Sequence, residues 1–224
     1  VNKTSIMLAV LIFTAAISWN FAGPLMTLIS YVGIFAAGIS SIVTFGFWMP
    51  FIGFIVNPRP HLAPKTWLIF AAGEGFFIGT ISLVFETMFP GIVLEAVSLT
   101  FCVAATLLFL YKSGLVKPSQ NFVLMLCSAI FGILIFYIGV FIYSLVTGSS
   151  PEIFSGSSNF SIGLSLFVVG MAALSLVLDF DIIEQSAERG SPKYMEYFGA
   201  MALVTTLVWL YIEILRLLAK FRSR

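Results

Sequence analysis

Long apolar runs, with almost no charge inside them, are the feature that most constrains how this chain can fold. Crossing the hydrocarbon core of a bilayer takes about 20 mostly apolar residues in a helix, because a helix satisfies its own backbone polar groups and lipid offers them no partner. Of the 224 residues, 60% are apolar and 9% are charged, against roughly 25% charged in soluble domains. The sequence therefore predicts an all-α integral membrane protein in contact with the lipid bilayer.

Seven such runs predict seven transmembrane helices in one domain, residues 1–224, because the connecting segments are short and rich in proline and glycine. The second run is too long for one upright helix, and Gly46, Pro50 and Gly53 favour a tilt or kink within it. The first run is followed by no small-residue cleavage site, so we interpret it as a span and not as a signal peptide. The predicted spans are residues 5–21, 25–56, 67–85, 91–110, 122–146, 162–183 and 197–218.

Small residues recur within the spans, for example Gly75 and Gly79. They let helix backbones approach closely in a membrane, and their even scatter over the second to sixth spans predicts a ring packed around the last one. Cys102 and Cys127 lie inside apolar runs, where we interpret them as small buried apolar residues.

The distribution of basic residues bears on orientation. Seven spans put the two ends of the chain on opposite sides of the membrane. The loops on the side of the first residues receive seven Lys or Arg, whereas the loops on the other side hold only Glu86 and Glu152. The positive-inside rule then favours a cytoplasmic N-terminus, although Lys220, Arg222 and Arg224 at the other end oppose it.

Four acids lie within the predicted spans: Glu74, Asp179, Asp181 and Glu213. A charge near the bilayer centre costs at least ~2.5–3.5 kcal/mol, so an acid kept there has a task or a partner. Glu74 and Asp181 lie at similar depths from the same side, so we expect that they can meet. Glu213 approaches the opposite side, and Arg216, one helical turn on, can pair with it.

Three segments carry a resemblance to a known family. The stretch LDFDIIEQ at residues 178–185, the segment EGFFIGTIS at residues 74–82 and the pair Leu215-Arg216 together resemble the transmembrane Bax inhibitor motif family, and more narrowly its bacterial Bax inhibitor/YccA-like branch. The resemblance covers nearly the whole chain and rests on the order of these segments. It implies a seven-helix bundle whose last helix is surrounded by the other six, in a bacterial inner or plasma membrane. It also implies a pH-sensitive calcium leak, controlled by two aspartates on the last two helices and by an arginine that latches the first.

Carried over to this chain, the resemblance gives Asp181 as the first aspartate and Glu74 as the glutamate that several branches carry. Thr206 stands where the second aspartate is expected, so the usual pair is incomplete. Either Glu74 or Asp179 partners Asp181, or this branch has lost the sensor. Glu213, two turns after Thr206 and on about the same face, is a further candidate. Arg59 is the expected latch by position, and Arg216 is the other candidate.

Carboxylates suit calcium, a hard cation that takes oxygen ligands in loose geometry. We therefore expect calcium as a transient, permeant ligand of Asp181 and Glu74, with no resident cofactor. Two close carboxylates in a low dielectric cannot both ionise freely, so such a pair can act as a pH sensor.

Other classes of function fit less well or remain open. A membrane metal hydrolase needs several His or Asp ligands, and the one histidine, His61, lies between prolines in a loop, so we expect no enzyme. A net charge of +1 does not indicate the basic surface that binding to nucleic acid requires. A proton-coupled transporter, or a non-conducting regulatory or assembly protein, stays an alternative to the channel, and the sequence does not indicate protein partners.

Overall fold

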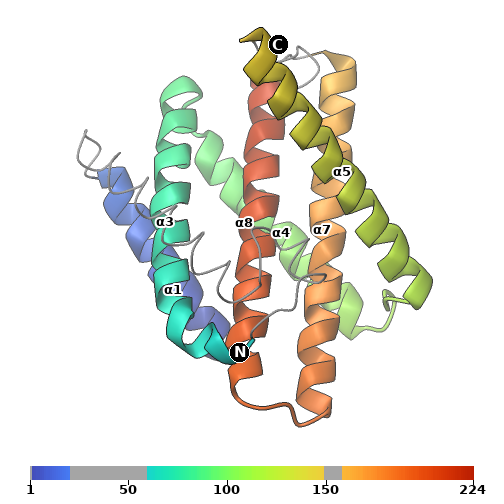
Figure 1. Cartoon of the computed structure of the whole chain (residues 1–224). Coiled ribbons are helices and arrows are strands. Elements are labelled where there is room, and N and C mark those ends of the chain that lie inside the picture. Colours follow the sequence, from blue (N-terminus) through green and yellow to red (C-terminus); the bar gives the residue numbers. More distant parts are fainter. Residues whose placement is uncertain (1, 21–59, 149–157) are drawn as a thin grey trace. The chain divides into compact units, whose positions relative to one another are not determined.

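The computed structural model describes residues 2–20, 60–148 and 158–224, and these are almost entirely helical. Figure 1 shows the helices α1, α3, α4, α5, α7 and α8. A short 3-10 helix, η1 (Pro60–Leu62), precedes α3. The helices are α1 (Asn2–Asn20), α3 (Ala63–Met88), α4 (Ile92–Lys112), α5 (Gln120–Thr147), α7 (Asn159–Glu188) and α8 (Tyr194–Arg222).

Local sequence explains where the helices begin and end. Gly91 joins α3 to α4 with a φ of 83°, and Gly148 follows α5 with a φ of 69°, a backbone conformation that glycine adopts without strain. The hydroxyl of Ser119 accepts a hydrogen bond from the Phe122 N–H and caps the start of α5.

Six helices in the described part of the chain are long and apolar enough to cross a membrane. They correspond to six of the seven predicted spans, and α3, α7 and α8 extend three or more residues beyond both ends of their apolar runs. The predicted span at residues 25–56 lies outside the described residues, so the count of seven stays a prediction. In the most apolar segment of α8, 61% is buried, the largest share among these six helices. The prediction that this helix lies at the centre of the bundle also stays a prediction.

The chain divides into two compact units. The first comprises Val1–Pro90 and Asp179–Val208, and in it α1 and α3 lie side by side (Figure 1). Gly75 and Gly79 lie on the face of α3 that contacts α1. A Cβ at Gly75 would collide with the Thr14 side chain and the Leu11 carbonyl, and one at Gly79 would lie 2.6 Å from the Ala15 carbonyl. The predicted packing role of these two glycines is therefore confirmed.

The second unit comprises Gly91–Leu178 and Trp209–Arg224. Two glycines of α5 are not in close contact with a neighbour, because a Cβ at Gly132 or Gly139 would meet nothing within 4 Å. These glycines do not mark a close approach between the described helices.

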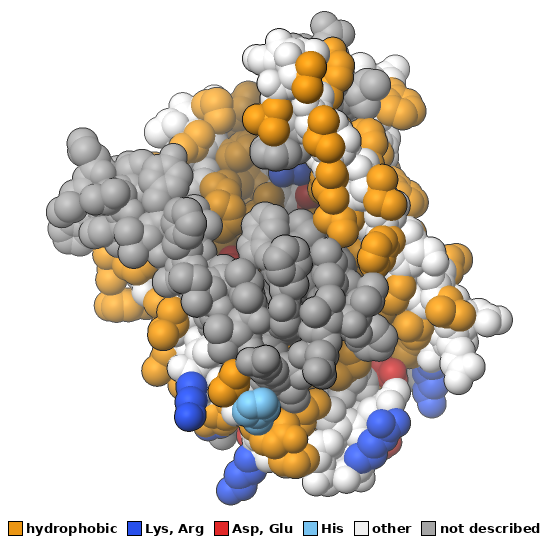
Figure 2. All heavy atoms as spheres, viewed as in Figure 1, with side chains coloured by type: hydrophobic (Ala, Val, Ile, Leu, Met, Phe, Trp, Pro, Cys, Tyr) orange, Lys and Arg blue, Asp and Glu red, His pale blue; other side chains and the backbone are white. Residues whose placement is uncertain are grey.

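Large apolar side chains on the outer faces of the helices are exposed, among them Phe13, Leu94 and Val146. Apolar side chains also make up much of the described surface on the face seen in Figure 2. This is expected of surfaces that contact lipid. The prediction that Cys102 and Cys127 are buried is wrong, since both are exposed. The physical reason is that lipid accepts a small apolar residue as readily as a protein core does, so an apolar run does not tell the two apart.

Candidate functional site: intramembrane acids and their partners

Asp179 on α7 is the most unusual of the four intramembrane acids. The Thr206 hydroxyl of α8 is a hydrogen-bond partner of its carboxyl group. The Oδ2 atom of Asp179 is buried, yet it has no hydrogen-bond partner among the residues that the structure describes. A buried carboxyl oxygen without a donor is costly in a low-dielectric interior, so this atom is suited to receive a proton or a cation.

Thr206, the partner of Asp179, is also a residue that the sequence singled out. It occupies the place where the resemblance implied a second aspartate, and it is buried, with its hydroxyl oxygen 3.2 Å from the Ala202 carbonyl oxygen. The structure therefore brings Thr206 to Asp179.

Asp181 lies nearer the end of α7 and is half-buried. Its Oδ2 accepts a hydrogen bond of 2.6 Å from the Gln185 amide, and the Gln185 oxygen accepts one of 2.9 Å from Arg189. These three residues are spaced four apart and form a chain along one face of the helix. Its assignment as the first family aspartate stays a prediction.

Glu74 is half-buried on α3, between Gly73 and Gly75, roughly 16 Å along the helix from Ala63. Among the described residues, no hydrogen bond or ion pair joins Glu74 to Asp181, so the prediction that the two acids meet also stays a prediction. Arg59, the expected latch, lies outside the described residues.

Glu213 belongs to the second unit and has the partner that the sequence predicted. Arg216 Nη1 donates to both of its carboxylate oxygens, at 3.0 and 3.2 Å, and Glu213 is only 3% exposed. The hydroxyl of Tyr137, from α5, donates to Glu213 Oε1 at 3.2 Å and accepts from Arg216 at 3.3 Å. Because Arg216 and Tyr137 already donate hydrogen bonds to the buried carboxylate of Glu213, Glu213 is less suited to a transient cation than Asp179.

Lys220, one turn beyond Arg216 and two residues after the predicted last span, is only 7% exposed. Its ammonium donates to Ser165 Oγ at 2.8 Å, to Ser161 Oγ at 2.7 Å and to the Ser161 carbonyl at 3.3 Å. A serine pair spaced i, i+4 on a helix was the signal available in the sequence, although it did not indicate which residue would contact it.

Within residues 2–20, 60–148 and 158–224, no three His, Cys, Asp or Glu side chains gather closely enough to hold a metal ion. A calcium ion bound there would need backbone carbonyls or water to complete its shell, since it takes six to eight oxygen ligands.

Apolar helices of spanning length, with ionisable side chains held inside them, define a polytopic integral membrane protein. Within that class, the chain belongs to the Bax inhibitor 1-like family, whose model matches residues 1–223. Comparison with curated proteins and with solved structures found no match.

Proposed function

We propose that this protein is a pH-sensitive calcium leak channel of the Bax inhibitor type, gated by buried carboxylates. Membership of the family supports the proposal, as does the retention of four acids in the spanning helices. The proposal includes a bacterial inner or plasma membrane as the location, with a cytoplasmic N-terminus.

The observation that carries the proposal is the buried Oδ2 of Asp179, beside Thr206, which has no hydrogen-bond partner in the part of the chain that the structure describes. Ionised, this carboxylate attracts a cation such as calcium. Protonated, it loses that attraction and can donate a hydrogen bond of its own. Opening then depends on which of the two forms is present, and therefore on pH. Asp181 and Glu74 would act as further cation ligands, and Arg59 as the latch.

A test uses purified protein in liposomes that contain a calcium-sensitive dye, with calcium flux measured from pH 5 to 8. We expect wild-type flux to change with pH and Asp179→Asn to lose most of that response. Asparagine keeps the shape of the side chain but cannot ionise, so it resembles the protonated acid at every pH. Thr206→Val, which removes only the hydroxyl partner, should shift the pH response without abolishing it.

Glu213→Gln is the matched control, because Glu213 is already paired with Arg216. If Glu213→Gln or Asp181→Asn removes the pH response while Asp179→Asn keeps it, Asp179 is not the gating acid. If wild-type liposomes leak calcium no faster than empty ones at any pH, the channel proposal fails. Proton flux coupled to a substrate would then favour the transporter, and no flux of either kind would favour a regulatory or assembly protein.

A further inference from the structure

The Thr206 hydroxyl has two oxygen acceptors within reach. One is the carboxyl group of Asp179 on α7, and the other is the Ala202 carbonyl on its own helix, 3.2 Å from the hydroxyl oxygen. A hydroxyl carries one hydrogen and two lone pairs, so it can donate to only one of the two acceptors at a time. Which acceptor receives the hydrogen therefore depends on whether the carboxyl group carries a proton.

The two protonation states of Asp179 require opposite arrangements of this hydroxyl. An ionised carboxylate only accepts hydrogen bonds, so the Thr206 hydroxyl donates to it and no longer to the Ala202 carbonyl. A protonated carboxyl group can itself donate to the Thr206 oxygen, and the hydroxyl then donates to Ala202. Thr206 decides the outcome because the second carboxyl oxygen, Oδ2, has no hydrogen-bond partner among the described residues.

No charged side chain in the described part of the chain competes with Thr206 for this carboxyl group. Burial and the Thr206 hydroxyl are the two influences on Asp179 that the structure shows. Asp181 on the same helix is hydrogen-bonded to a glutamine, and Glu213 of α8 is held in an ion pair with an arginine. Among the described residues, neither of these acids nor Glu74 of α3 forms a hydrogen bond with Asp179.

The bond from Thr206 to the Ala202 carbonyl affects the shape of α8. A threonine hydroxyl that bonds to the carbonyl four residues earlier often bends a helix. The bend would fall near the place where α8 passes from the first compact unit to the second, between Val208 and Trp209. Forming or breaking this one bond can therefore change the direction in which the helix continues.

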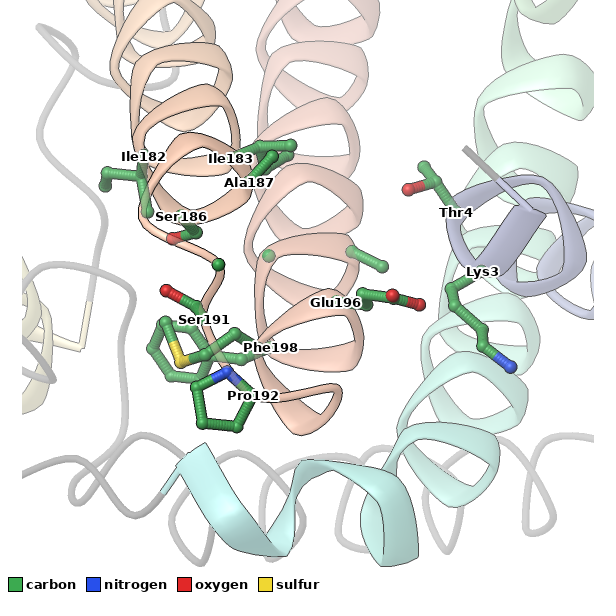
Figure 3. Close-up of a pocket in the computed structure, with 14 residues that line it drawn as sticks. Lys3, Thr4, Ile182, Ile183, Ser186, Ala187, Ser191, Pro192, Glu196 and Phe198 are labelled. Atoms are coloured by element: carbon green, nitrogen blue, oxygen red, sulfur yellow. The ribbon is translucent and has the colours of Figure 1, made fainter.

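On its other side, Thr206 is followed by a loosely packed end of the same helix pair. Here α7 contacts α8 at Ile183 and Gly199, where a Cβ on the glycine would lie 2.9 Å from the isoleucine side chain. The same two residues line a cavity of about 420 Å³ that continues to the α7–α8 turn (Figure 3). Protein interiors are normally close-packed, so a cavity here leaves room for α8 to move.

We propose that the Thr206 hydroxyl transmits the protonation state of Asp179 on α7 to the backbone of α8 at Ala202. When Asp179 is ionised, the hydroxyl bonds to it and the bond to Ala202 is broken. When Asp179 is protonated, the bond to Ala202 forms and α8 bends there. Thr206 is thus a positioning residue for the pH response and carries no proton of its own. This inference rests on the proposed role of Asp179 as the gating acid.

The composition of the chain allows both ends of this connection to be observed by NMR. The chain has two aspartates, Asp179 and Asp181, and two Ala–Leu pairs, at residues 173–174 and 202–203. Cell-free synthesis with aspartate labelled with carbon-13 at the side-chain carboxyl gives two signals, which Asp181→Asn assigns. Alanine labelled with carbon-13 at the carbonyl, together with leucine labelled with nitrogen-15, gives one signal for each Ala–Leu bond and so reports the Ala202 carbonyl.

The test follows both signals in the purified protein in detergent from pH 5 to 8. We expect the Ala202 signal to move together with the Asp179 carboxyl signal, with the same midpoint. Thr206→Val should abolish the movement at Ala202 while Asp179 still titrates, and Thr206→Ser, which keeps a hydroxyl, should restore it. Asp179→Asn should hold the Ala202 signal at its low-pH position, because an amide N–H donates to the hydroxyl as a protonated acid does. The Ala173 signal is the control, since the residue four positions on, Val177, has no hydroxyl.

Three results would overturn the proposal. The Asp179 carboxyl signal could stay constant between pH 5 and 8, the Ala202 signal could stay constant while Asp179 titrates, or its movement could survive in Thr206→Val. The calcium assay separates this inference from the leak itself. Liposomes that leak with a pH response while Ala202 stays constant would keep the channel and remove the hydroxyl connection. Coupled NMR signals in a protein that does not leak would keep the connection and remove the channel.

Discussion

At the scale of single residues, Lys220 shows how an ammonium group is accommodated inside a membrane protein. Its known acceptors are hydroxyls and a carbonyl, all from the first two turns of α7. Three acceptors match the three N–H donors of an ammonium group, which makes burial of its charge tolerable.

Replacing this lysine should therefore be destabilising. Lys220→Met keeps an unbranched apolar side chain of similar length but leaves the serine hydroxyls without their donor. We expect a loss of about 1–3 kcal/mol in stability, measured as a lower midpoint of thermal unfolding in detergent. The exposed residue Lys193 gives the control, Lys193→Met, which should leave the midpoint unchanged. Equal midpoints for the two variants would show that the Lys220 contacts do not contribute to stability.

The sequence indicated some of these residue-scale contacts and not others. The Glu213–Arg216 pair was predictable because both residues lie on one helix, one turn apart. The contact of Tyr137 with that pair was not, because spacing within a helix does not tell which residue a neighbouring helix places opposite. For the same reason the sequence could not foresee that Asp179, and not Asp181, would contact Thr206.

At the scale of helices, the described spans were predictable almost completely, because about 20 apolar residues in a row leave no alternative to a helix in lipid. Their ends were less predictable. The predicted span 162–183 ends where polarity rises, but α7 continues to Glu188, since a helix can run on into water with exposed polar side chains. The length of an apolar run thus indicates how much of a helix crosses the membrane, and not where the helix ends.

The α1–α3 contact gives a prediction at this scale. Gly75→Ala should disturb it, because the new methyl group would meet the backbone carbonyl of Leu11, which cannot move as a flexible side chain can. We expect a loss of about 1–3 kcal/mol, measured by thermal unfolding. Gly132→Ala is the matched control: it makes the same change within a helix, at a position where a Cβ meets nothing. If the two variants unfold at the same temperature, close packing at Gly75 is unimportant.

At the scale of the whole molecule, the number of spans can be tested by where cysteines are labelled. Cys102 and Cys127 are first replaced by serine, and single cysteines are then placed at positions 2, 113 and 191 for a membrane-impermeant thiol reagent. Positions 113 and 191 lie in the turns that follow α4 and α7. With seven spans, all three cysteines lie on the same side of the membrane. If residues 25–56 do not cross it, position 2 will be labelled from the side opposite to position 113.

Position 191 serves as the internal reference, since α5 and α7 separate it from position 113 whatever residues 25–56 do. With a cytoplasmic N-terminus, the reagent should label none of the three positions in intact cells and all three after permeabilisation. Labelling of all three in intact cells would reverse the orientation.

The polar contacts of α8 also bear on how the protein is assembled during synthesis. This helix carries Glu213, Arg216 and Lys220 within its last three turns, a costly combination for a helix that enters lipid alone. Their partners Tyr137, Ser161 and Ser165 belong to α5 and α7. Because a ribosome makes α5 and α7 before α8, these partners are already in place when the charged helix leaves the insertion machinery. The order of the helices in the gene thus lets the least lipid-compatible segment enter the membrane against a surface that already holds its partners.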